Sequence, residues 1–196
     1  MALSDYDGLK ASVADFLNKT NLTSQIPDFI TLAEAQLNLD LDCREMSGLA
    51  ILSISQDSYP LPYDFDAVLS LRLDGDVKDI PAVSPDQLDG FPWVGKPTGY
   101  AVLDRLIFAP APDANYQATM RYRKRIPALS SSNKCNWLLK RHPGAYLYGS
   151  LLQAAPYLRD DERISVWSGL YTAAVDALNQ NEKRTVGKLN ARGRAF

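Results

Sequence analysis

The residues that could carry chemistry in this chain of 196 residues are few and widely spaced. His142 is the single histidine, and it stands directly before Pro143, where a helix start is expected. We interpret it as a cap or loop residue, because a general base needs a positioned partner. Neither Cys43 nor Cys135 has a second cysteine at the spacing of a zinc site. The sequence therefore predicts no metal, no cofactor and no catalytic residue of these types.

Paired carboxylates are the next candidates for chemistry. Asp64 and Asp66 form one pair, and Asp74 and Asp76 form another. Both pairs stand in turn-like contexts, where aspartate is favoured because its side chain bonds to the backbone. A hydrolytic or calcium-binding role remains an alternative. A cell-wall hydrolase that uses Glu34 or Asp64 is accordingly one alternative function.

A glycine-containing segment, Gly90–Lys96 (GFPWVGK), has the spacing of a phosphate-binding loop. In such loops a Ser or Thr follows the lysine and holds the metal ion, whereas here Pro97 follows. Pro92 also removes one of the N–H groups that would cradle a phosphate. We therefore predict that this segment binds no nucleotide.

A basic cluster lies at the end of the longest predicted strand, over residues 116–126. Alternation along a strand places Ala118, Met120 and Tyr122 on one face and the arginines on the other. We predict a subunit or partner interface here. Two alternatives stay open: a charged edge that prevents strand pairing, and a nucleic-acid-binding module that contacts phosphates. The cluster consists of Arg121, Arg123, Lys124 and Arg125.

The C-terminal segment, 183–196, carries five basic and no acidic side chains. Alone it buries too little apolar surface to offset the entropy of ordering. It is either a disordered solubilising end or an arm that becomes ordered on an acidic partner surface. As an arm, its binding residues would be Lys183, Arg184, Val186, Lys188, Leu189, Arg192, Arg194 and Phe196.

The charge of the chain is divided between its halves. Residues 1–90 hold 16 acidic and 5 basic side chains, a net charge of −11, and residues 91–196 hold 7 and 16, a net charge of +9. Such a chain can pair with itself inside one fold. It can also pair head-to-tail with other copies, as in a ring built from two different faces.

Helices are expected at both ends of the chain. Apolar residues at spacings of three and four predict helices over about 4–18 and 25–41. Pro143 stands where a later helix begins, and Pro156 should kink or end it. Asp160 is the expected cap of the last helix, whose apolar pattern ends at Asn179–Asn181.

Strands are expected in the middle of the chain, from Leu49 onward. Asp74–Asp76 predicts a turn between strands at Val68–Leu73 and Val77–Ile80. A second hairpin is predicted around Asp104 and Arg105. Together these elements predict an α+β fold, in which the N- and C-terminal helices form a bundle with an inserted antiparallel β-rich subdomain.

The predicted divisions follow from this order of elements. The helical part comprises residues 1–48 and 130–182, the β-rich part residues 49–129, and the basic arm residues 183–196. No run approaches the roughly 18 apolar residues of a membrane-spanning helix. The first ten residues lack the apolar region of a signal peptide, so we predict no membrane partner.

Several short segments, taken in order, cover most of the chain and carry a family resemblance. Each is short and structural in type, and their joint order is what is specific. The chain resembles the head-to-tail adaptor (connector) proteins of tailed bacteriophages. The segments are Ala33–Met46 (AEAQLNLDLDCREM), Tyr59–Phe65 (YPLPYDF), Ser84–Gly90 (SPDQLDG), Arg105–Tyr116, Arg121–Ser130 (RYRKRIPALS) and Asn136–Arg163.

The resemblance implies a virion structural protein without catalytic residues or cofactor. It implies a ring of about twelve copies at the portal vertex, docked on the portal protein, with tail or nozzle proteins below and genomic DNA in the channel. The protein would reach this place from the host cytoplasm during assembly. In that family the C-terminal segment commonly reaches toward the portal, which suits the basic segment 183–196. Some proteins of related systems are described as cell-wall hydrolases, which no residue pattern here supports.

Overall fold

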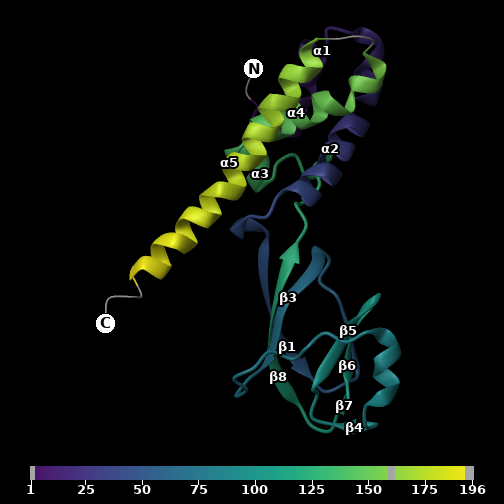
Figure 1. Cartoon of the computed structure of the whole chain (residues 1–196). Coiled ribbons are helices and arrows are strands. Elements are labelled where there is room, and N and C mark those ends of the chain that lie inside the picture. Colours follow the sequence, from purple (N-terminus) through teal and green to yellow (C-terminus); the bar gives the residue numbers. More distant parts are fainter. Residues whose placement is uncertain (1–2, 159–161, 193–196) are drawn as a thin grey trace. The chain divides into compact units, whose positions relative to one another are not determined.

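The structure of the protein is a computed structural model that describes residues 3–158 and 162–192, with the backbone alone at 20, 89 and 181–192. The chain forms two compact units (Figure 1). The helical unit comprises Met1–Arg44 and Ile126–Phe196, and the strand unit comprises Glu45–Arg125. Helices and antiparallel sheets both occur, so the predicted α+β class is confirmed.

The first two helices of the helical unit lie close to their predicted ranges. α1 spans Tyr6–Leu17. The Asp5 carboxylate accepts a hydrogen bond from the Gly8 N–H at 2.7 Å, which satisfies a donor that has no partner inside the helix. A 3-10 turn, η1 (Thr20–Gln25), leads into α2, which spans Ile26–Asp40.

Shorter helices follow where the chain returns from the strand unit. α3 (Trp137–Arg141) begins after Asn136, whose side-chain oxygen accepts a backbone N–H of the first turn at 2.9 Å. α4 spans Pro143–Gln153. Pro156 stands in the following 3-10 turn, η4 (Ala155–Tyr157), so α4 ends before this proline as predicted.

The last helix, α5, spans Arg163–Arg192 and is longer than the sequence predicts. The predicted end at Asn179–Asn181 is wrong. The expectation that the following segment does not stay folded on its own is also wrong for its residues up to Arg192. Residues 182–192 are mostly Glu, Lys, Arg, Leu and Ala, which are good helix formers. Adding them to an existing helix requires no new nucleation. The predicted cap, Asp160, lies outside the described residues.

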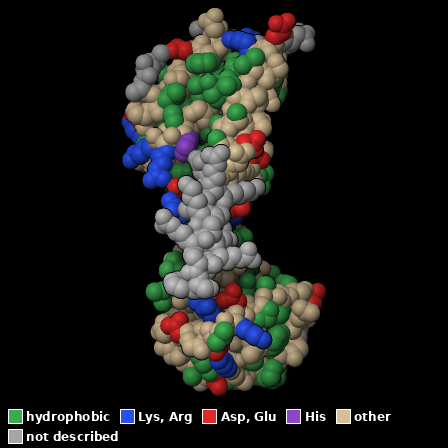
Figure 2. All heavy atoms as spheres, turned by 60° about the vertical axis from the view of Figure 1, so that its left-hand side comes forward, with side chains coloured by type: hydrophobic (Ala, Val, Ile, Leu, Met, Phe, Trp, Pro, Cys, Tyr) green, Lys and Arg blue, Asp and Glu red, His purple; other side chains and the backbone are tan. Residues whose placement is uncertain are grey.

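α4 is the centre of packing in the helical unit, where it contacts α1, α2, α3 and α5. Gly149 lets the helices approach closely, because a Cβ there would lie 3.2 Å from the Tyr171 ring of α5 and 3.4 Å from the Ala33 Cβ of α2. The Tyr171 hydroxyl donates to Asp40 of α2 at 2.7 Å, so α2 and α5 also meet directly. Hydrophobic side chains also gather on the surface of this unit, on the side where α5 lies (Figure 2).

The strand unit is built on an antiparallel sheet with the order β1-β8-β3. β1 spans Ser47–Ile54, β3 spans Phe65–Leu73 and β8 spans Tyr116–Lys124. Ser47 pairs with Arg123, so the first and last strands of the unit lie side by side where the chain enters and leaves it.

A second antiparallel sheet has the order β2-β6-β5, and a short parallel pair joins β4 and β7. The β5–β6 hairpin at Asp104 and Arg105 is confirmed. Two 3-10 turns, η2 and η3, complete the unit. The bounds of the remaining strands and of these two turns are β2 Ser58–Pro60, β4 Val94–Gly95, β5 Gly99–Val102, β6 Arg105–Ala109, β7 Ala111–Pro112, η2 Arg44–Met46 and η3 Pro85–Gly90.

The two larger sheets share one apolar core. β8 contributes the face that alternation predicts, namely Ala118, Met120 and Tyr122. Leu71 of β3 and Leu106 of β6 lie in the same cluster. The other face of the β1-β8-β3 sheet contributes no residue to this cluster, so the sheet is packed on one side.

The predicted hairpin between Val68–Leu73 and Val77–Ile80 is only half correct. Gly75, at φ 86°, makes the turn after β3. The described residues Val77–Ile80 form no strand, however, and a single hydrogen bond joins the Ile80 N–H to the Leu71 carbonyl at 2.7 Å. β3 pairs with β8 instead, because that longer strand offers a matching apolar face.

Candidate interaction surfaces

Glu34 of α2 is the one buried carboxylate among the described side chains, with 6% of its surface exposed. It accepts hydrogen bonds from the Leu129 N–H at 2.7 Å and from the Tyr146 hydroxyl at 3.0 Å. Asn136 in turn donates to the Tyr146 hydroxyl at 2.6 Å. Burial raises the pKa of Glu34 above its ordinary value, although both hydrogen bonds act in the opposite direction. This enclosure leaves no room for a substrate at Glu34 and weighs against the hydrolase alternative.

The same network holds the segment by which the chain re-enters the helical unit, residues 126–136. Asn38 of α2 accepts a hydrogen bond from the Ile126 N–H at 2.8 Å. Asn136 donates to the Pro127 carbonyl oxygen at 2.7 Å. The polar side chains of α2 that face this segment therefore fix a connection, and their role is structural.

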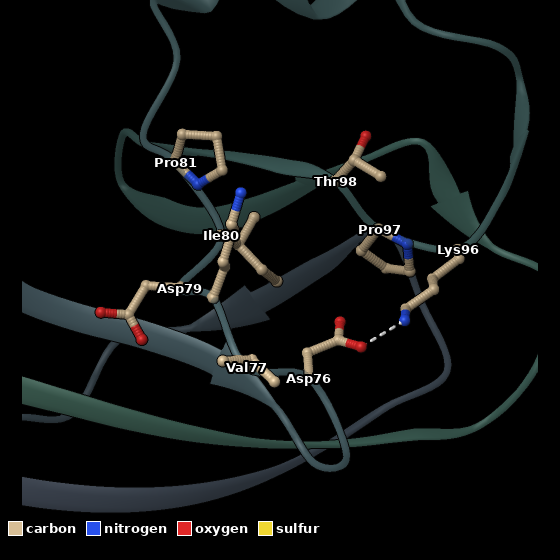
Figure 3. A pocket seen from close by; sticks show the side chains of 9 residues that line it. Asp76, Val77, Asp79, Ile80, Pro81, Lys96, Pro97 and Thr98 are labelled. Carbon is tan, nitrogen blue, oxygen red and sulfur yellow. Dashed lines mark hydrogen bonds and ion pairs between the residues drawn. The ribbon is translucent and has the colours of Figure 1, made fainter.

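The Asp74/Asp76 turn borders a pocket of about 450 Å³ in the strand unit. Lys96 lies across this pocket and donates to Asp76 at 2.6 Å (Figure 3). Lys96 is the lysine of the segment with phosphate-loop spacing, and Val94–Gly95 directly before it form strand β4. Because an ion pair occupies the lysine and a strand replaces the loop, the arrangement does not form a phosphate cradle.

The basic cluster lies on β8 and just after it, and Asp66 of β3 neutralises part of it. Arg123 contacts Asp66 at 2.8 Å and Arg125 contacts the same carboxylate at 3.5 Å. Arg121 is exposed, and Lys124 is half-buried. Because one acid binds two arginines, less positive charge is available to a phosphate, which weighs against the nucleic-acid-binding alternative.

Arg121 belongs to an open surface that we call the outer sheet face, defined by the outward residues of β1 and β8: Leu49, Ile51, Thr119 and Arg121. Leu49 pairs with Arg121, and Ile51 pairs with Thr119. Both aliphatic side chains are largely exposed. Exposed apolar residues beside an arginine are typical of protein-binding surfaces.

The outer sheet face continues into a polar hollow of about 170 Å³. Arg72 of β3 and Asp79 line it together with Arg121 and Thr119. Sequence reasoning missed the apolar part of this face. The signal was present in β1, Ser47–Ile54, where apolar residues stand at successive positions and so must occupy both faces of the strand.

A second surface that the sequence did not reveal surrounds Trp93, which is almost fully exposed. It stands at a pocket of about 420 Å³ that is lined mainly by apolar side chains, including Phe91, Ile107 and Pro110. An exposed tryptophan beside an apolar pocket can bury a large area on contact with another protein.

The predicted arm falls partly within the described chain. Its positions from Lys183 to Arg192 lie on the backbone of α5, and Arg194 and Phe196 lie outside the described residues. The structure thus brings Arg121, Arg123, Lys124 and Arg125 together at one place. The arm residues from Lys183 to Arg192 share one helix.

The described part of the chain offers neither a metal-binding cluster nor a membrane-spanning helix. Within 3–158 and 162–192, histidine, cysteine and acidic side chains form no group of three or more that could ligate a metal ion. Within the same ranges, no helix combines the length and the apolar character needed to cross a membrane.

Comparison with known proteins gives one finding for nearly the whole chain. The model of a family described as SU10 adaptor protein matches residues 4–194. No curated protein matches the chain. The matched range includes the whole strand unit, nearly all of the helical unit and all of α5.

Proposed function

We propose a function for this chain from one premise, which is that it belongs to the SU10 adaptor protein family. This membership confirms the resemblance predicted from the sequence. It indicates a structural adaptor of a bacteriophage particle that associates with other virion components at the head-to-tail junction. We propose further that twelve copies form a ring between portal and tail, and that this ring seals and conducts the genomic DNA.

The observation that carries the proposal is the extent of the family match. It spans 191 residues, from 4 to 194, so the likeness extends over both the helical unit and the strand unit of this chain. The internal contacts of the polar side chains support a mechanical role. Glu34 accepts a hydrogen bond from Leu129 in the segment 126–136, Lys96 pairs with Asp76, and Asp66 pairs with two arginines. Each of these contacts holds the fold in place.

The proposed portal contact is the arm, residues 183–196. Its five basic side chains are suited to an acidic groove, and its apolar positions supply anchors within such a groove. A helical backbone through Arg192 lowers the entropy lost on docking, because much of the arm is ordered beforehand.

The strand unit is proposed to contact the tail. Its outer sheet face and the pocket beside Trp93 supply two surfaces of the kind that protein partners cover. A contact through one such surface is weak by itself. Docking on a portal raises the effective concentration of neighbouring copies, so that many weak contacts form together. We therefore expect the isolated chain to be monomeric and the ring to form on the portal.

Mass photometry of the purified chain, alone and with purified portal, tests this proposal. Deletion of 183–196 should reduce portal binding by about tenfold or more, because the arm's charges and anchors are lost together. The melting temperature should change little. A milder variant, with Lys183, Lys188 and Arg192 replaced by Gln, should weaken binding in the same direction.

The matched control replaces three exposed bases elsewhere, Lys19, Lys78 and Arg105, by Gln. It removes the same charge and should bind the portal normally. Docking that survives deletion of the arm would contradict the portal contact. A stable ring in the absence of portal would contradict the dependence on portal but not the adaptor role.

A further inference from the structure

α2 carries an exposed apolar stripe on the side opposite its buried face. Leu32 is 52% and Leu39 is 77% exposed, and Ala35 between them is exposed too. At 100° per residue, these three positions lie within an arc of about 60°. We call them the α2 stripe. A surface helix normally places polar residues on this side, so such a stripe indicates a partner.

α5 carries a second stripe, made of Val166, Leu170, Ala173 and Ala177. Val166 is 59% and Leu170 is 41% exposed, and both alanines are exposed. The four positions also lie within an arc of about 60°, beside the buried line of Trp167 and Tyr171. The α5 side of the helical unit shows hydrophobic side chains gathered on its surface (Figure 2).

The two stripes match in spacing and point away from a common centre. Intervals of three and four residues separate successive members of both stripes, as in helices that pack side by side at a small angle. α4 contacts the inner sides of both helices, so the stripes lie on outer sides of the helical unit. Each stripe combines large aliphatic residues with alanines that permit close approach.

Charge also suits one helix to the other. Of the three acidic residues of α2, Glu34 is buried and Asp40 accepts from Tyr171 of the same chain. Asp28 is therefore the one beside the stripe, and α5 begins with the exposed Arg163. Asp28 stands one turn before Leu32, and Arg163 stands just before Val166. Opposite charges at corresponding ends favour one orientation of contact and guide the encounter.

We propose that the occupant of the α5 stripe is the α2 stripe of a second copy of this chain. This inference rests on the proposed ring and names its subunit contact. The contact is heterologous, because two different faces meet, and repetition by rotation leaves no stripe uncovered once the ring closes.

Ring symmetry also sets the direction of the contact. α2 and α5 run in the same general direction within one helical unit (Figure 1). Neighbours in a ring of twelve differ by a rotation of only about 30°, so α2 of one copy stays nearly parallel to α5 of the next. A parallel arrangement with matched intervals places Leu32 opposite Leu170 and Ala35 opposite Ala173.

Cross-linking between two variants of the full chain tests this contact. One variant carries Ala35→Cys and the other Ala173→Cys, and the two are mixed at high concentration, with and without portal, under copper-phenanthroline oxidation. We expect a cross-linked dimer between the variants, at least about fivefold more abundant with portal. The matched control pairs Ala35→Cys with Thr172→Cys, because Thr172 is also exposed but lies about 100° around the helix.

Each outcome decides one of the two proposals. A 35–173 yield no higher than the 35–172 yield, with portal docking intact, overturns the interface and leaves the adaptor role standing. Cross-linking at 35–173 in concentrated protein that does not dock on portal supports the interface and contradicts the portal contact. Oxidation of the parent chain, with Cys43 and Cys135 in place, gives the background, and mass spectrometry of the linked peptides identifies the pair.

Discussion

The central helix of the helical unit, α4, and the central strand of the main sheet in the strand unit, β8, differ in how the fold covers them. In the helical unit, α4 is enclosed by other helices, and the buried polar side chains Glu34 and Asn136 have hydrogen-bond partners. In the strand unit, the β1-β8-β3 sheet is packed on one side only, and Leu49 and Ile51 remain open on the other. The comparison indicates that internal contacts fix the helical unit as a frame. The strand unit keeps a broad face for contacts outside the chain.

The largest expected effect comes from overpacking one glycine in each unit. Gly149→Leu forces a side chain between α4, α2 and α5, and we expect a loss of about 3 kcal/mol of stability. Gly48→Val presses on the Tyr122 ring, because even a Cβ at Gly48 would lie 2.6 Å from it. Asp64 holds the Tyr122 hydroxyl at 3.1 Å, and we expect a loss of about 2 kcal/mol. Calorimetry should show whether each change lowers a transition of its own unit.

Gly169→Ala is the control for these substitutions. A Cβ at Gly169 meets nothing within 4 Å, and the residue lies in α5, so alanine should stabilise the chain by up to about 1 kcal/mol. Equal losses at Gly169 and Gly149 would contradict the enclosed packing of α4. A Gly48→Val protein that melts like the parent would contradict the Tyr122 contact.

An intermediate effect is expected from Glu34→Gln, measured as a function of pH. The pKa of Glu34 is raised by burial, so its carboxyl stabilises the fold fully below pH 4.5, and this contribution is lost as the pH rises through the raised value. Glutamine keeps an oxygen that can accept from Leu129 and Tyr146 but does not titrate. The melting temperature of the variant should therefore rise relative to that of the parent as the pH increases from 4 to 8.

Asp7 shows why the pH range matters for that measurement. Hydrogen bonds from Lys134 and then from Lys10 lower the pKa of Asp7 to about 2. Its contribution is present above its ordinary value of 3.8 and is lost as the pH falls toward 2, which is outside the range of Glu34. A constant difference between parent and Glu34→Gln from pH 4 to pH 8 would show that the Glu34 carboxyl is solvated.

The smallest effect on stability is expected on the outer sheet face. Leu49→Ser combined with Ile51→Thr should change the free energy of unfolding by about 0.5 kcal/mol or less, because both side chains are exposed. Met120→Ser, on the inner face of the same sheet, should cost several times more. Urea titration of the two proteins compares the faces, and similar losses for both would mean that the outer face is covered.

Local signals predict the bounds of α1 and α2, the end of α4 and the faces of β8 well. Asn136 caps α3, α4 ends before Pro156, and Met120 and Tyr122 point into the core as alternation requires. These features depend on residues within a few positions of one another, so a single sequence contains the information. The basic cluster of β8 is likewise found in one place, because its members are neighbours in the chain.

Long-range pairing and surface exposure could not be derived in this way. β3 pairs with β8 across more than forty positions of sequence, and nothing local distinguishes that partner from the closer Val77–Ile80. The apolar stripe on α5 was missed because Val166 and Leu170 stand next in sequence to Trp167 and Tyr171, which are buried, and a single sequence does not show that this second apolar line stays exposed.

The pairing of Ser47 with Arg123 has a consequence for how such a chain can diversify. The polypeptide enters and leaves the strand unit at two adjacent points, so this unit is an insertion with neighbouring ends. Another insert with neighbouring ends can replace it without rethreading the helices around it. A chain of this design can therefore change its strand unit while it keeps its helical unit.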